Sequence, residues 1–144
     1  MPQAISTRPW HLLPVALLLL LWHGALALDY LNDRFALASD MPYLMESLPL
    51  DALWLKVAWA MTVWLGLLGA VFLLWGDDAS VLLIFAAAVA MLAVLTGIVL
   101  SGAPVDLAGL PAERGWQIVA PALVLVPLLG WLYARWQKRR RVLH

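Results

Sequence analysis

The stretch "ASVLLIFAAAVAMLAVLTGIVLS", from Ala79 to Ser101, contains no charged side chain along its whole length. A helix rises about 1.5 Å per residue, so a helix of this length crosses a hydrocarbon core of about 30 Å. A helix also satisfies its own backbone hydrogen bonds in lipid, whereas an open strand edge does not. The stretch therefore predicts a transmembrane helix.

Three further apolar segments flank it, at about residues 12–28, 52–75 and 116–134. Apolar residues continue around each segment instead of alternating with polar ones, which argues against barrel strands. The sequence predicts an all-α membrane protein, a bundle of four transmembrane helices that forms one domain over residues 1–144.

The composition agrees with a membrane protein. Of the 144 residues, 65% are hydrophobic and 12% are charged, and the mean hydropathy is +0.89. Soluble domains are only about half apolar. The chain has no cysteine, which excludes disulfides, thiolate zinc sites, iron–sulfur clusters and thiol nucleophiles.

The basic residues predict the orientation, because cytoplasmic loops carry an excess of Lys and Arg. One side of the predicted bundle would hold Arg8 and the tail residues Arg135, Lys138, Arg139, Arg140 and Arg141. The other side holds only Arg34 and Arg114. We therefore expect both termini in the cytoplasm, with the five basic tail residues in contact with anionic lipids.

Small residues predict close helix packing in the second and third spans. Residues spaced four apart on a transmembrane helix let two backbones approach each other, and the candidates are Gly66, Ala70, Ala86, Ala90 and Gly97. The two spans are joined only by Gly76–Asp78, so we expect a tight hairpin. In the acidic first loop, apolar residues at 41, 44, 45 and 48 predict a short amphipathic segment at about 41–48.

Ionisable residues inside a membrane segment are candidates for function. His23 is about five residues from the expected outer end of the first span, and Lys56 is about four from that of the second. We therefore expect the two at a similar depth, with Asp29 and Asp51 at the surface above them. The four residues form a candidate polar, proton or solute site. Alternatively, Lys56 extends to the interface and His23 hydrogen-bonds a neighbouring helix.

The first span has a second interpretation. Arg8, the apolar run and Ala25-Leu26-Ala27 fit the pattern of a cleaved signal peptide over residues 1–27. The bulky Trp22 and the polar His23 near the cut favour a retained span instead. Cleavage would remove His23 from the mature protein.

The sequence offers no evident catalytic machinery. His11 and His23 lie about 18 Å apart on one helix, and spans two to four contain no histidine, so they do not predict a bis-histidine haem. No triad-like group, metal-ligand cluster or glycine-rich phosphate loop is present in the sequence. We expect no enzyme activity, cofactor, metal or nucleic-acid partner.

The groups "LWHGALALDY", "WAMTVWLGLLGA", "VLSG" and "WLYARWQKRR" resemble a family of small uncharacterised bacterial proteins with four transmembrane helices, some loosely labelled sugar transporters. The chain differs from that family at Asp77 and Asp78, where basic residues are expected. The resemblance implies a four-helix architecture and the bacterial inner membrane.

Two functions follow as hypotheses. The first is an accessory or assembly subunit of a membrane complex, in which changes at Gly66 or Ala90 disrupt assembly. The second is a small-solute transporter that acts as an oligomer, in which replacing His23 and Lys56 with leucine abolishes transport. A quinone- or lipid-interacting redox component is a third class.

Overall fold

The computed structural model describes residues 9–37, 48–102 and 112–143, with side chains from residue 117 onward in the last range. It contains four helices: α1 (Leu12–Phe35), α3 (Leu53–Trp75), α4 (Ala79–Ser101) and α5 (Ala112–Arg139). All four are long and apolar enough to cross a membrane. The described residues contain no strand, and the predicted four-helix class is confirmed.

The bounds of α4 agree with the predicted span, and α3 begins one residue later than expected. The outer two helices are longer than their apolar runs: α1 continues beyond residue 28 to Phe35, and α5 covers residues 112–139 instead of 116–134. The predicted segment at 41–48 lies, except for Leu48, outside the described residues.

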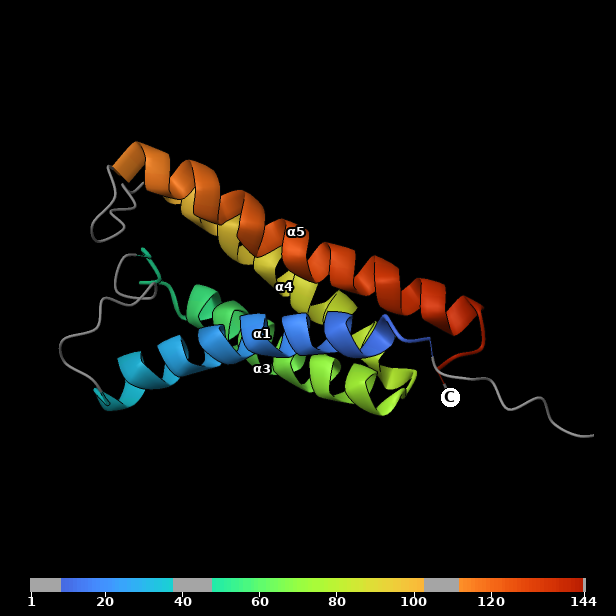
Figure 1. Cartoon of the computed structure of the whole chain (residues 1–144). Helices are drawn as coiled ribbons and strands as arrows, with labels where there is room; N and C mark the ends of the chain where they lie inside the picture. Colours follow the sequence, from blue (N-terminus) through green and yellow to red (C-terminus); the bar gives the residue numbers. More distant parts are fainter. Residues whose placement is uncertain (1–8, 38–47, 103–111, 144) are drawn as a thin grey trace, which may run out of the picture.

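The helices run alternately up and down, so the start of α1 and the end of α5 lie at the same end of the bundle (Figure 1). The contact between α3 and α4 is the most extensive, and α1 packs mainly on α3. α5 packs on α4 and touches α1 at few positions.

The expected hairpin of α3 and α4 is present, and its turn explains the short connection. Gly76 has φ +81°, in the left-handed region that a side chain disfavours. The Asp77 carboxylate accepts a hydrogen bond from the backbone N–H of Ala79 at 2.8 Å. Ser80 donates its hydroxyl to the Asp77 carbonyl at 2.7 Å. The first bond satisfies a backbone N–H at the start of α4 that has no partner within the helix.

Small residues lie along the α3–α4 contact. Ala70 is fully buried, Ala90 is buried, and Gly97 lies against Trp54 and Leu55 of α3. Ala86 is half-exposed and differs from its neighbour Ala87, which is fully buried.

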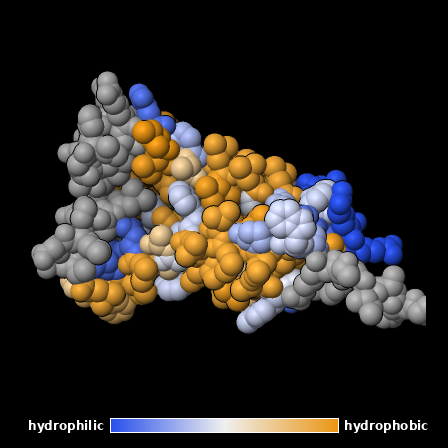
Figure 2. All heavy atoms as spheres, viewed as in Figure 1, coloured by the Kyte–Doolittle hydropathy of each residue, from blue (hydrophilic) through white to orange (hydrophobic). Residues whose placement is uncertain are grey.

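The surface of the bundle is apolar around its middle. Figure 2 shows hydrophobic side chains over the middle of one face and hydrophilic ones at the end where α5 finishes. Trp10 and Trp75 are exposed near that end, and Trp54 is exposed at the start of α3, toward the opposite end. Exposed tryptophans at both ends are typical of the interfacial belt of membrane proteins.

Candidate functional site

His23 of α1 lies in the interior of the bundle, with only 1% of its surface exposed. Its imidazole packs on Gly66 of α3. A Cβ atom at Gly66 would lie 2.8 Å from His23 Cγ and closer still to Cε1 and Nδ1. The absence of a side chain at Gly66 therefore creates the space that the imidazole occupies.

Several buried polar atoms of the bundle are unusual for a membrane interior. Both ring nitrogens of His23 and the indole nitrogens of Trp22 and Trp59 are buried, without a hydrogen-bond partner among the described residues. Most buried polar side-chain atoms have at least one partner, and an unsatisfied polar group in low dielectric is costly. A neutral imidazole provides one donor and one acceptor. His23 is thus able to hydrogen-bond or to exchange a proton with a polar group that reaches it.

Thr62, about one turn from Gly66, behaves differently. Its hydroxyl contacts the carbonyl oxygens of Ala58 at 3.1 Å and Ala87 at 3.4 Å. The first is on its own helix and the second on α4. Thr62 is therefore satisfied and adds a polar contact between α3 and α4.

The structure does not bring Lys56 to His23. His23 contacts Gly66, and Lys56 lies ten residues before Gly66 on α3, about 15 Å away along the axis. Lys56 is exposed, whereas His23 is buried. The expectation that His23 and Lys56 lie at the same depth is therefore wrong. α1 continues to Phe35, so His23 lies twelve residues from the end of its helix, near the middle.

The acidic residues of the expected site lie beyond it. Asp29 is half-exposed in the later part of α1, and Asp51 is exposed before the start of α3. The distance along α1 between His23 and Asp29 is about 9 Å. Of the four expected residues, only His23 is in the interior.

A second polar cluster, which the sequence did not suggest, joins α1 to α5 at the end with the termini. His11 Nδ1 lies 2.7 Å from the Tyr133 hydroxyl, and the Gln137 amide donates to that hydroxyl at 2.6 Å. The hydroxyl is then available to donate to His11. Gln137 is 1% exposed although it follows an apolar span. The only local sign is the spacing of Tyr133 and Gln137, which places them on one face of a helix.

The basic tail divides into groups with different contacts. Lys138 forms an ion pair with Asp78 of the α3–α4 turn at 2.8 Å. The guanidinium of Arg135 lies 5.3 Å from the centre of the Trp131 ring, and that of Arg140 lies 3.9 Å from the centre of the Trp136 ring. Arg139 and Arg141 are exposed. The ion pair gives the acidic turn a structural role.

The groups of the site are suited to hydrogen bonding and helix packing. In the part of the chain that the structure describes, no three His, Asp or Glu side chains are grouped as metal ligands. Comparison of the chain with models of protein families, with curated proteins and with solved structures finds no match.

Proposed function

We propose that this integral membrane protein is an accessory or assembly subunit that acts by packing against a transmembrane helix of a partner. The observation that carries the proposal is an apolar groove of about 460 Å³ between α1 and α5. It is lined by Val15, Leu18, Leu19, Trp22, Val126, Leu129, Gly130 and Tyr133.

The groove exists because α5 leans on α4 and touches α1 at few positions. Gly130 is one of those positions, since a Cβ atom there would lie 2.8 Å from Leu19 Cδ2. Beside this contact, Leu18 is 66% exposed and Leu129 is 59% exposed. Their side chains form the two rims of the groove.

The occupant that we propose for this groove is a helix. Association of helices in lipid is driven by van der Waals packing, because lipid tails are as apolar as leucine. A helix in the groove would pack on two helices at once. The lining extends over about two turns of each wall, with Trp22 and Tyr133 at opposite ends because α1 and α5 run antiparallel. Two turns of contact suit a partner helix that crosses the bundle.

Site-specific photocrosslinking in native membranes tests the proposal. A crosslinking amino acid at Leu18 or Leu129 is expected to give one adduct of defined mass. The same residue at Leu68, which is 47% exposed on α3, is the matched control and should give none. The mass of the adduct distinguishes a second copy of this chain from another polypeptide. Equal labelling from Leu68 and Leu129 would refute a docked helix in the groove.

The orientation and location are part of the proposal. The excess of basic residues near the termini supports a cytoplasmic location for both, and the resemblance described above supports the bacterial inner membrane. Because the chain lacks cysteine, a single cysteine that replaces Asp77 or Asp51 is its only thiol. Labelling of that thiol reports on which side of the membrane the position lies. A membrane-impermeant maleimide applied to intact cells should label the cysteine at 51 and not that at 77.

A small-solute transporter is the second candidate, and one observation favours it. The ring nitrogens of His23 are buried without a partner among the described residues, as expected of a group that binds a polar solute during transport. In this alternative, His23→Leu abolishes solute uptake into vesicles, whereas the exposed Lys56→Leu has little effect. Unchanged uptake by both variants would remove the alternative.

A further inference from the structure

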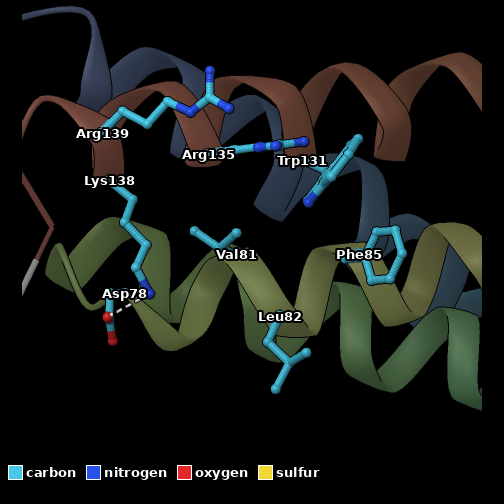
Figure 3. Close-up of a pocket in the computed structure, with 8 residues that line it drawn as sticks. All are labelled: Asp78, Val81, Leu82, Phe85, Trp131, Arg135, Lys138 and Arg139. Carbon is cyan, nitrogen blue, oxygen red and sulfur yellow. Dashed lines mark ion pairs between the residues drawn. The ribbon is translucent and has the colours of Figure 1, made fainter.

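We propose that a groove between α4 and α5 binds one anionic glycerophospholipid, with its phosphate on Arg135 and Arg139 and its acyl chains on Phe85 and Trp131. The groove has a volume of about 470 Å³ (Figure 3). It is separate from the groove between α1 and α5, and its ligand does not depend on the accessory role.

The groove changes from polar to apolar along its length. Lys138 and Asp78 lie at the end of the bundle with the termini, whereas Phe85 and Trp131 lie about 10 Å deeper along their helices. The rings of Phe85 and Trp131 are 5.1 Å apart between centres, so they close the deep end. A glycerophospholipid has the same polarity: a charged headgroup at the interface and apolar chains below it.

The charges in the groove favour an anionic ligand. Three basic side chains and one acidic side chain line it. Lys138 of α5 forms an ion pair with Asp78, which directly precedes α4, so these two charges cancel. Arg135 and Arg139 remain on the α5 side (Figure 3). Two positive side chains that line the groove therefore have no acidic partner in its lining. A zwitterionic lipid carries no net charge, so its binding would leave the net positive charge of Arg135 and Arg139 unchanged.

The two arginines lie close together along α5. They are four residues apart on α5 and thus lie on one face, one turn apart. Arg135 is oriented by the Trp131 ring, which its guanidinium approaches to 5.3 Å. A guanidinium that stacks on a ring retains its in-plane N–H donors, which match phosphate oxygens in pairs.

The other tail arginines provide a control of equal charge. Arg140 lies over Trp136, which does not line this groove, and Arg141 also lies outside its lining. A general attraction between the tail and an anionic surface would use all four arginines alike. A groove site requires only Arg135 and Arg139.

Native mass spectrometry of the delipidated full chain tests the proposal with two probes, dioleoyl phosphatidylglycerol and dioleoyl phosphatidylcholine at equal concentration. We expect one phosphatidylglycerol retained per chain, at least fivefold more than phosphatidylcholine. R135Q/R139Q should lower this retention to the phosphatidylcholine level, and R140Q/R141Q should change it less than twofold. Should R135Q/R139Q fail to fold, Leu82→Glu adds a negative charge at a lining position that is 70% exposed, and should cause the same loss.

Three results would overturn the proposal. Equal losses from the two double variants would indicate nonspecific attraction to the tail. Equal retention of the two lipids would remove the requirement for negative charge. Displacement of phosphatidylglycerol by soluble glycerol phosphate at similar concentration would show a free-phosphate site, in which the apolar wall has no role.

Discussion

Gly66→Ala is expected to destabilise the bundle, because the new methyl group must enter the space of His23. Three ring atoms of His23 lie within 2.8 Å of the position that this methyl would take. Real Cβ atoms almost never approach a neighbour below 3.0 Å. The imidazole is 1% exposed and has little room to turn away. Relief therefore requires α1 and α3 to separate locally.

The expected cost is that of inserting one methyl group into a packed core, about 1–3 kcal/mol. This corresponds to a change of about 5- to 150-fold in the unfolding equilibrium constant. The matched control is Gly24→Ala in α1, where a Cβ atom would meet nothing within 4 Å. Because alanine is the better helix former, this control should leave the free energy of unfolding unchanged or slightly higher.

The measurement is reversible unfolding in mixed micelles with increasing sodium dodecyl sulfate, followed by tryptophan fluorescence. A double-mutant cycle with His23→Ala isolates the contact, since removal of the ring should make Gly66→Ala nearly neutral. If Gly66→Ala behaves like Gly24→Ala, or if its cost is the same with and without the imidazole, the assigned contact is refuted.

Three further predictions use the same unfolding measurement. Gly69→Ala should lower the free energy of unfolding more than Gly97→Ala. The methyl group at 69 would meet a backbone nitrogen of α4 at 3.1 Å, whereas the one at 97 would meet side chains that include an exposed tryptophan. Equal losses would contradict this ranking. Tyr133→Phe should cost about 1 kcal/mol, since it removes a hydroxyl shared by two side chains, and no change would mean that the hydroxyl bonds are not formed. Asp78→Asn should lower the free energy of unfolding by less than about 1 kcal/mol, because the ion pair with Lys138 is half-exposed, and the effect should disappear in high salt. A larger loss that does not depend on salt would show that the pair is desolvated and would contradict this prediction.

Hydropathy predicted the two inner helices well, because α3 and α4 begin and end close to the limits of their apolar runs. It failed at the end of α1 for a physical reason. An apolar run marks where lipid ends, whereas a helix continues until its backbone is capped. α1 continues through residues 29–34, which include Asp29, Asn32, Asp33 and Arg34, and its end is closed by Ala36 in the left-handed conformation. His23 therefore lies twelve residues from the end of α1 instead of the five expected, a difference of about 10 Å along the helix.

The cluster of His11, Tyr133 and Gln137 has a different reason for being missed. Its members are up to 126 residues apart in the sequence, and no local spacing relates His11 to the end of α5. The bond exists because four antiparallel helices return the chain to its starting end. Contacts of this kind depend on how helices pack side by side, which a single hydropathy pattern does not specify.

The contact between His23 and Gly66 also changes which experiment separates the two proposed functions. The sequence assigned Gly66 to packing and His23 to a polar site, so variants of Gly66 were expected to test assembly and variants of His23 to test transport. In the structure they form one contact, and a change at either disturbs both the packing of α1 and the environment of the imidazole. Leu18 and Leu129 avoid this coupling, because both are exposed on the groove between α1 and α5. Leu129→Trp, with the crosslinking residue at Leu18, should prevent docking of a partner helix and leave the contact between α1 and α3 unchanged. Loss of a crosslinked partner with unchanged solute uptake would then identify assembly as the function.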